Sequence, residues 1–501
     1  MNFSNQYSGF RLVAAFLIFS WLLSCSEREP YQPPPQGQIK FDLLEIQRKG
    51  KLTALCRYDP SSYFIYKGQP MGYEYDLLNR LAEHLMVELE VKVPRTWEEL
   101  YEMLHTGEGD IVAASMKVTL EGTEKVAFTD NHSTTRQMLI QRKPEGWRKL
   151  KRHQIDKRVV RSPLQLVDKE IHVQQKSSYN RRLVNLSQEI GGRIKIAKVS
   201  EEMETAFLIK MVAEGTIDYT VADENLVRGY ETYYTNLDAK TPLSFPQKIA
   251  WAVRKNSPQL LEEINEWLRN IKTGKDPTFN VIYSKYFKSS RAFARRMSSD
   301  YLSINGGKLS PYDSLFKLYS KDLGWDWKLL ASVAFQESKF DSRAVSWAGA
   351  VGVMQLLPST AEELGIKHPK NPRESIKAGV KLLKLLYAYW KNVPDPGEQL
   401  KFTLASYNAG KGHIEDARRL AEKFGKDPDI WADNVAEYLL KKSERKYFYD
   451  NVVRYGYCRG EEPYNYVKEI LERYKIYQQY EEYLENGTTS GVDLLSYKKQ
   501  L

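Results

Sequence analysis

A glutamate at position 337 places an ionisable side chain on the apolar face of a predicted helix. Leu330, Val333 and Ala334 precede Glu337 by seven, four and three residues, which are spacings that share one helical face. Burial on such a face disfavours the charged form of a carboxyl group and raises its pKa. A carboxylic acid with a raised pKa can donate a proton near neutral pH, so Glu337 is predicted to be a general acid.

Glu337 has no obvious acidic companion in the sequence around it. Asp341 is adjacent, but it falls at the expected end of the helix that carries Glu337. Cleavage of a glycosidic bond needs a proton for the leaving oxygen, and in some enzymes a group of the substrate replaces the second carboxylate. The pattern therefore indicates a glycan-cleaving enzyme that works with a single catalytic acid.

Two later segments carry residues suited to holding a sugar chain. Residues 349–355 read Gly-Ala-Val-Gly-Val-Met-Gln, and residues 405–410 read Ala-Ser-Tyr-Asn-Ala-Gly. The glycines permit close backbone approach, and the amides of Gln355 and Asn408 offer donors and acceptors to N-acetyl and hydroxyl groups. The alternatives are tight helix packing for the glycines, core packing for Tyr407 and a structural ion pair for the helical glutamate.

Together these segments resemble the lysozyme-like domain of the soluble lytic transglycosylases. That family shows E-S, then G-x-x-G-x-M-Q, then A-Y-N-A-G, and Glu337-Ser338 and the two later segments follow this order. The family's later E-T-R-x-Y is matched to residues 443–447, with Arg445 in place of Thr. The resemblance implies an all-α domain with Glu337 as the catalytic residue. It also implies substrate-binding roles for Ser346, Met354, Gln355, Tyr407, Asn408 and Glu444.

The same resemblance implies a specific reaction on peptidoglycan glycan strands. The β-1,4 bond between MurNAc and GlcNAc is cleaved without water. Glu337 protonates the bridging oxygen and then deprotonates the muramic C6 hydroxyl, which closes a 1,6-anhydro ring. One residue that acts first as acid and then as base fits the missing second carboxylate. A muramidase that uses water and a non-catalytic receptor for muropeptides remain as alternatives.

The first half of the chain predicts a two-lobed α/β domain. Strand-like segments at residues 51–57 and 89–93 alternate with helical segments at residues 76–85 and 97–104, and a second such series follows from about residue 171. Alternation of strands and helices implies parallel sheets, and a crevice at the ends of such strands is a preferred ligand site.

A segment of this half resembles a known family of binding proteins. Residues 68–78 read Gly-Gln-Pro-Met-Gly-Tyr-Glu-Tyr-Asp-Leu-Leu and are similar to a signature of the family 3 extracellular solute-binding proteins. Members that bind free amino acids usually carry Arg shortly after the Thr that matches Thr119, where it clamps the ligand's carboxylate, but Gly122 follows here. We therefore expect a muropeptide or other cell-wall peptide as ligand. Asp223, Arg136 and Lys176 are candidates either for the crevice or for the surface.

The N-terminus is typical of a bacterial lipoprotein signal. Arg11 precedes an apolar run from Leu12 to Leu23, and residues 22–25 read Leu-Leu-Ser-Cys, which resembles a lipobox with Cys25 as the acylated residue. The run is short for a membrane span, and a signal-anchor helix and an ordinary cleaved signal are the alternatives. Ser26, in place of Asp, favours the outer membrane, where the lipid would hold the protein facing the periplasm.

The composition and net charge of the chain indicate which classes of binding partner to expect. The 501 residues carry a net charge of +10 and are 42% hydrophobic, which indicates two or three folded domains and anionic partners such as the cell wall. We find no nucleic-acid motif, zinc-ligand spacing or P-loop, and we expect no nucleic-acid partner, no metal and no cofactor. With Cys25 acylated, Cys56 and Cys458 are expected to be buried free thiols.

The expected architecture is multidomain, with a bilobal α/β periplasmic-binding-protein-like domain followed by an all-α lysozyme-like domain. An anchor, a binding domain and a catalytic domain in this order resemble the membrane-bound lytic murein transglycosylases. The expected boundaries are 1–24 for the signal peptide, 25–40 for a Pro-rich tether, 41–290 for the binding domain, 291–310 for a linker, 311–475 for the catalytic domain and 476–501 for a tail.

Overall fold

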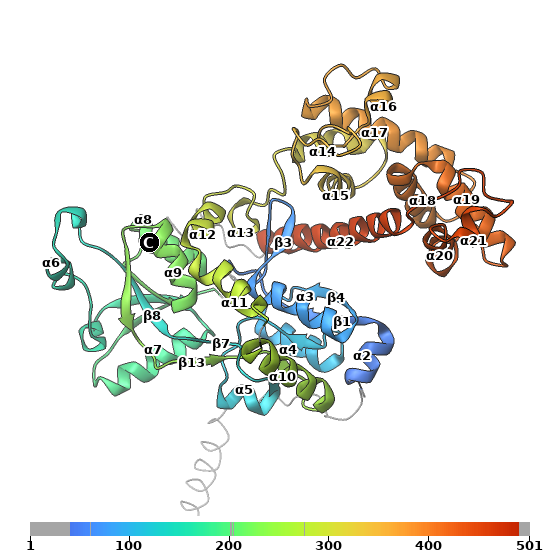
Figure 1. Cartoon of the computed structure of the whole chain (residues 1–501). Helices are drawn as coiled ribbons and strands as arrows, with labels where there is room; N and C mark the ends of the chain where they lie inside the picture. The colour runs from blue at the N-terminus through green and yellow to red at the C-terminus, as the bar shows by residue number, and fades with distance from the viewer. Residues whose placement is uncertain (1–40, 61, 201–202, 204, 275, 490–501) are drawn as a thin grey trace, which may run out of the picture. The chain divides into compact units, whose positions relative to one another are not determined.

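The computed structural model describes residues 41–60, 62–200, 203, 205–274 and 276–489 (Figure 1). The first half of this range contains two five-stranded sheets. The first sheet has the order β4-β1-β5-β14-β6, with β1 at Lys51–Leu55, β4 at Glu88–Lys92, β5 at Ile111–Val112, β6 at Ala127–Phe128 and β14 at Ala252–Val253. The second has the order β10-β9-β11-β8-β12, with β8 at Gln137–Arg142, β9 at Glu170–Gln174, β10 at Lys195–Val199, β11 at Tyr219–Asp223 and β12 at Leu237–Pro242.

In each sheet three neighbouring strands, counted from one edge, pair in parallel, as the alternation of strands and helices predicts. Strand β1 pairs in parallel with β4 and β5, and β9 pairs in parallel with β10 and β11. The chain leaves the first sheet through β7 (Ser133–Thr135) and returns through β13 (Gln247–Ile249), and these two strands pair antiparallel. Because the second sheet is inserted between these strands, the domain has two lobes, and the predicted bilobal α/β architecture is confirmed.

Helices pack on both sheets. Those of the first lobe are α2 (Leu43–Lys49), α3 (Tyr73–Leu85), α4 (Trp97–Thr106), α5 (Leu120–Lys125) and α10 (Pro258–Thr273). Those of the second lobe are α6 (Arg152–Asp156), α7 (Ser178–Glu189), α8 (Thr205–Glu214) and α9 (Glu224–Tyr233). Three short helices follow, and they are α11 (Thr278–Tyr283), α12 (Ser290–Met297) and α13 (Ser303–Gly306).

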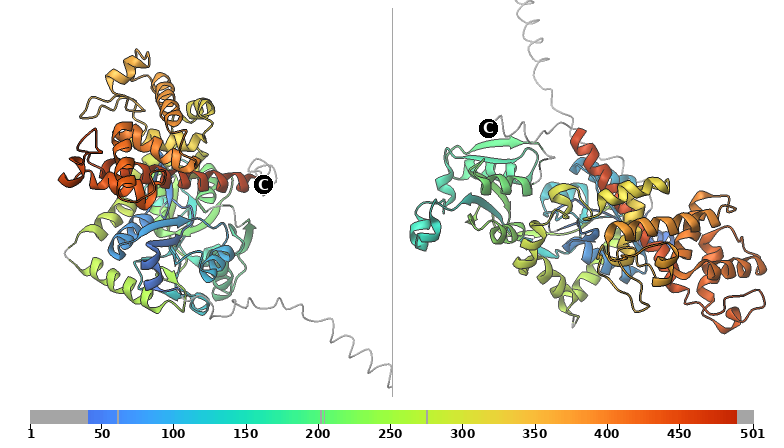
Figure 2. Two further views of the ribbon diagram at one scale, coloured as in Figure 1. Left: turned by 90° about the vertical axis from the view of Figure 1, so that its right-hand side faces the viewer. Right: turned by 90° about the horizontal axis from the view of Figure 1, so that it is seen from above.

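The described residues from 307 onward are helical and contain no named strand. The helices are α14 (Asp313–Tyr319), α15 (Trp327–Ser338), α16 (Pro358–Glu363), α17 (Pro372–Tyr389), α18 (Pro396–Ala409), α19 (Lys411–Lys423), α20 (Ala436–Lys441), α21 (Arg445–Phe448) and α22 (Glu461–Thr489). Helix α22 packs against α15, α18 and α20, and Figure 2 shows it in red among the yellow and orange helices of this half. It runs unbroken across residue 475, where the sequence suggested the start of a tail.

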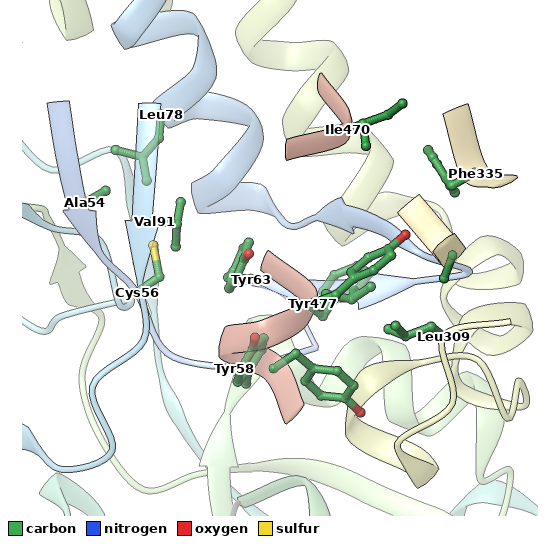
Figure 3. Packing of buried hydrophobic residues seen from close by; sticks show 14 of the residues in the cluster. Ala54, Cys56, Tyr58, Tyr63, Leu78, Val91, Leu309, Phe335, Ile470 and Tyr477 are labelled. Atoms are coloured by element: carbon green, nitrogen blue, oxygen red, sulfur yellow. The ribbon is translucent and has the colours of Figure 1, made fainter. Parts of the chain in front are cut away.

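The core extends from the α/β lobes into the helices, since the described residues from 41 onward belong to one compact unit. Figure 3 shows Phe335 of α15 with Ile470 and Tyr477 of α22 inside this core. The Tyr477 hydroxyl donates to the Gly68 carbonyl at 2.6 Å. One helix therefore contacts both the binding-protein-like half and the helical half.

Some local expectations are met and one is wrong. Cys56 and Cys458 are buried free thiols, as predicted, whereas Cys25 lies outside the described residues. The spacing of Ser359 and Glu362 in the sequence predicts a capping box, and this prediction is wrong, because Pro358 already occupies the first helical position and Leu357 is the cap. Among the described residues, no helix is both long and apolar enough to cross a bilayer.

Candidate active site

Glu337 lies in the last turn of α15, a helix formed mostly of buried residues. The Asp326 side chain accepts from the Lys328 N–H at the start of α15, and Lys339 ends the helix with a φ of 51°. The apolar residues that flank Glu337 put its carboxyl group in a desolvated environment, although the side chain remains partly exposed. This combination of burial and access is what a proton donor requires.

A tyrosine from a distant helix contacts this acid. Tyr466 of α22 donates a hydrogen bond to Glu337 Oε1 at 2.5 Å. Burial raises the pKa of Glu337 to about 7, and the Tyr466 hydrogen bond opposes that rise because it stabilises the carboxylate. No cation pairs with Glu337 within the described part of the chain, so a structural ion pair does not account for its burial.

Tyr407 of α18 belongs to the same group of side chains. Burial raises the pKa of Tyr407, and the nearby Glu337 charge adds to the effect. The pKa of Tyr466 is raised for the same reasons, with a further contribution from Tyr407. Both phenols therefore stay protonated at neutral pH and can act as hydrogen-bond donors.

The loop between α15 and α16 is held against the acid by two hydrogen bonds. Ser338 Oγ donates to the Val353 carbonyl at 2.8 Å, and the Tyr407 hydroxyl donates to the Met354 carbonyl at 2.8 Å. The first bond starts one residue after Glu337. The structure thus brings the three sequence motifs together.

Met354 and Gln355 contact other protein groups than the sequence suggested. The Met354 side chain is fully buried and packs against Gly379, so it is not available to a glycan. Gln355 Nε2 donates to the carbonyls of Ala344 and Gly352 at 3.1 and 2.9 Å. The Gln355 amide nitrogen therefore braces the loop, and its oxygen is the atom left for substrate.

The loop glycines serve backbone geometry and packing. A Cβ on Gly352 would lie 2.1 Å from the Pro369 carbonyl oxygen, so Gly352 permits close packing within the protein. Gly349 has a φ of +81°, which favours glycine. Ser346 Oγ accepts from the Ala350 N–H at 3.0 Å and closes the same turn. Gly352 is therefore better explained by tight packing within the protein than by close approach to a sugar.

The last turn of α18 carries an exposed side-chain amide, that of Asn408. Asn408 is exposed, and no other described residue hydrogen-bonds its side chain. Ser406 is buried instead and accepts from Trp390 Nε1 at 2.9 Å. This internal hydrogen bond explains the serine that precedes Tyr407, where the family pattern has none.

The sequence match assigned a role near the acid to Glu444, but the residue that contacts Glu337 in the structure is Tyr466. Glu444 is exposed at the start of α21 and makes no hydrogen bond to Glu337. In the pattern E-T-R-x-Y the Glu and Tyr are four residues apart, as are Glu462 and Tyr466, whereas Glu444 and Tyr447 are only three apart. The four-residue spacing of Glu462 and Tyr466 is therefore the signal in the sequence that points to Tyr466.

The two lobes of the first half meet at a second polar cluster. Lys117 Nζ lies 2.8 Å from Asp223 Oδ2, 3.1 Å from Ser178 Oγ and 4.5 Å from the centre of the Tyr179 ring. The Tyr179 hydroxyl donates to the same Asp223 oxygen at 3.1 Å. Asp223 Oδ1 and Gln137 Oε1 are buried without a hydrogen-bond partner in the described part of the chain.

Arg136 and Lys176 are the other two charged candidates of this half. Arg136 is exposed. Lys176, which follows β9 of the second lobe, pairs with Glu98 of α4 in the first lobe at 3.1 Å, and both side chains are more than half exposed. Asp223 and Lys176 therefore both pair with the opposite lobe, but the Asp223 pair is the more buried of the two. In the described residues, no group of acidic, histidine and cysteine side chains is arranged to hold a metal ion.

Comparison with known proteins assigns the α/β half and the helical half to two different families. Residues 52–289 match the bacterial extracellular solute-binding proteins of family 3, and residues 314–430 match the transglycosylase SLT domain. An ancestral amino acid-binding protein of known structure shares 28% identity over 49% of this chain and 98% of its own, with a TM-score of 0.41.

Relatives that span both halves carry one name, membrane-bound lytic murein transglycosylase F. The relative from Desulfosudis oleivorans is 35% identical over 87% of this chain and 92% of its own length. Those from Pseudomonas fluorescens and Aliivibrio fischeri are each 31% identical, over 87% and 89% of this chain and 86% and 87% of their own. Because the similarity covers the binding-protein-like half and the catalytic half together, the chain belongs to the membrane-bound lytic murein transglycosylase F family.

Proposed function

We propose that the chain is a peptidoglycan lytic transglycosylase in which Glu337 acts as both acid and base. The observation that carries this assignment is the state of Glu337, whose pKa burial raises to about 7 with no charged neighbour contributing. A neutral carboxylic acid at that pKa protonates the oxygen between MurNAc and GlcNAc. The resulting carboxylate then takes the proton of the muramic C6 hydroxyl, and this oxygen closes the 1,6-anhydro ring.

The surrounding groups suit this sequence of steps. The Tyr466 hydroxyl stabilises the carboxylate that exists between the two proton transfers. The free amide of Asn408, the Gln355 oxygen and the Ser346 hydroxyl are polar groups for the N-acetyl and hydroxyl groups of a sugar. Met354 takes part through its main chain, whose carbonyl fixes the Tyr407 hydroxyl.

Mass spectrometry of digested sacculi tests the reaction. The expected product ends in 1,6-anhydromuramic acid, which is lighter by one water than the product of a muramidase. Reducing ends in place of anhydro ends would favour the hydrolytic alternative. Sacculi that bind the protein without releasing any fragment would favour the receptor alternative.

We also propose that a cell-wall peptide in the binding-protein-like half regulates the enzyme. Lys117 supplies a cation near the site from which the usual Arg is missing at Gly122, and Asp223 faces it from the other lobe. A ligand that carries an ammonium and a carboxylate can pair with both side chains. Helix α22 offers a route to the acid, since Tyr477 contacts Gly68 while Tyr466 contacts Glu337 on the same helix.

Turnover of the intact protein with and without a soluble muropeptide tests this regulation. We expect the muropeptide to change the rate for the wild type and to have a smaller effect on Lys117→Met, because this substitution removes the cation but keeps a long side chain. An equal rate with and without muropeptide would contradict regulation and leave the assigned reaction intact.

We propose, finally, that acylated Cys25 anchors the protein to the outer membrane facing the periplasm. Ser24-Cys25-Ser26 and the preceding apolar run support this placement. Fractionation of cells tests it, since the wild type should sediment with outer membranes and Cys25→Ala should not. Recovery of the wild type with inner membranes would contradict the placement.

A further inference from the structure

We propose that Trp347 is a stacking platform for a pyranose ring of the glycan strand, at a subsite away from the bond that is cleaved. This inference rests on the proposed function, since it assumes that the strand passes Glu337. The Trp347 side chain is 99% exposed. Each of the other eight tryptophans in the described part of the chain packs against another ring or a cation, whereas Trp347 has no such contact.

Trp347 is held out by a tight turn. The Ser346 N–H donates to the Ala350 carbonyl at 2.9 Å, and the Gly349 N–H donates to the Ser346 carbonyl at 3.0 Å. Ser346 Oγ accepts from the Ala350 N–H at 3.0 Å and closes the turn from the inside. Three hydrogen bonds across residues 346–350 fix the backbone, so a ligand that meets the indole does not have to order this segment first.

Residues 343–347, which lead into the turn, alternate between exposed and partly covered side chains. Arg343, Val345 and Trp347 are exposed, whereas Ala344 and Ser346 between them are partly covered. Arg343 lies in a turn of its own and pairs with Asp341 at 3.9 Å, whereas Val345 forms an isolated bridge with Val351. The exposed side chains of Val345 and Trp347 are therefore two apolar groups that lie two residues apart in the chain.

The turn is tied to the reaction centre. Gly352 N–H donates to the Ala344 carbonyl at 3.0 Å, and the Val353 carbonyl accepts from Ser338 Oγ, next to Glu337 in the chain. Trp347 is six residues from Val353. An extended chain of that length reaches about 20 Å at most, so Trp347 lies within the span of a glycan strand several sugars long that is bound at the acid.

The chemistry of the Trp347 indole indicates which ligand it binds. Pyranose rings present flat faces of C–H groups, which lose water favourably on a large aromatic surface while their hydroxyl groups stay solvated at the rim. A fully exposed indole on a rigid turn of an enzyme for glycan strands therefore fits a sugar face. Because this contact lies away from the bond that breaks, it contributes to binding of the strand and leaves the proton transfers unchanged.

Substitution of Trp347 separates binding from chemistry. With sacculi as substrate and the full chain as enzyme, we expect Trp347→Ala to raise KM about tenfold and to change kcat by less than about twofold. Trp347→Tyr should recover most of the loss, because it restores a ring. In the Glu337→Gln background, which removes turnover, Trp347→Ala should weaken sedimentation with sacculi by a similar factor.

Phe245→Ala is the matched control, since Phe245 is another aromatic side chain with 88% exposure, in the loop after β12. It should behave like the wild type. The platform is overturned if Trp347→Ala keeps the wild-type KM and sedimentation, if Phe245→Ala loses as much, or if Trp347→Tyr recovers nothing. If the wild type itself released no fragments but Trp347→Ala still lost sedimentation, the assigned reaction would fail and the platform would stand.

Discussion

Glu74 in the binding-protein-like half and Glu337 in the helical half both sit in apolar surroundings, but at opposite ends of their helices. Glu74 lies in the first turn of α3, is fully buried and accepts from Trp251 Nε1 at 2.6 Å and from Ser115 Oγ at 3.1 Å. Glu337 lies in the last turn of α15 and accepts one hydrogen bond, from Tyr466.

These two positions have opposite electrostatic effects on a carboxylate. Glu74 lies at the positive end of its helix dipole and accepts from two donors, whereas the negative end of a helix and a single phenol leave the charged form of Glu337 poorly stabilised. The comparison shows that burial alone does not identify a catalytic carboxyl group. What distinguishes the acid is that it is buried with too few donors, and its pKa of about 7 is the result.

The largest expected effect comes from Glu337→Gln, which removes the proton that is transferred while keeping the shape of the side chain. We expect release of soluble fragments from sacculi to fall by about a thousandfold or more. Asp341→Asn is the control, because Asp341 is the adjacent acid in the chain and its side chain is 56% exposed. A large loss with Asp341→Asn would mean that the site uses two carboxyl groups.

Glu74→Gln tests the structural side of the comparison. The new amide cannot accept from both donors as the carboxylate does, so we expect a loss of about 3 kcal/mol in the free energy of unfolding. Urea unfolding of the full chain measures it, and Glu83→Gln on the exposed face of the same helix should change little. An unchanged unfolding curve for Glu74→Gln would contradict a structural role for Glu74.

Glu337→Gln should have the opposite effect on stability, and only at high pH. Below pH 4.5 the carboxyl group is neutral in both the folded and the unfolded state, so the substitution gains nothing. As the pH rises from 4.5 to about 7, the carboxyl group ionises in the unfolded chain but stays neutral in the folded wild type, so the wild type loses stability until the folded state ionises as well. We therefore expect the variant to be more stable than the wild type by about 3 kcal/mol at pH 8. Thermal unfolding at pH 4 and pH 8 measures the difference, and an equal difference at both would contradict the assigned pKa.

Tyr466→Phe is expected to have the smallest effect. Loss of the hydroxyl removes the hydrogen bond that lowers the pKa of Glu337, so this pKa should rise further above 7 and the alkaline limb of the activity profile should move to higher pH. Activity at pH 7 should fall about tenfold, because the carboxylate formed between the two proton transfers loses a donor. Tyr447→Phe is the control for the alternative motif match, and an equal shift of its profile would favour residues 443–447.

Local sequence determined much of the helical site. The offsets from Leu330 to Glu337 predicted a helix that buries its apolar face and has its acid near the end, and α15 has both features. Such signals work because a helix repeats every few residues, so the sequence of a short segment already defines its apolar face. The alternation of strands and helices predicted the two lobes for the same reason.

Tertiary packing decided which groups surround the acid. Tyr466 reaches Glu337 from 129 residues away, and Lys117 meets Asp223 only because two lobes face each other. Packing also buried Met354. No periodicity in one segment specifies which distant side chain fills the space beside it, because that depends on how whole helices and sheets pack. The sequence by itself therefore predicted which carboxyl group is buried on its helix, and the folded structure set the pKa and the partner of that group.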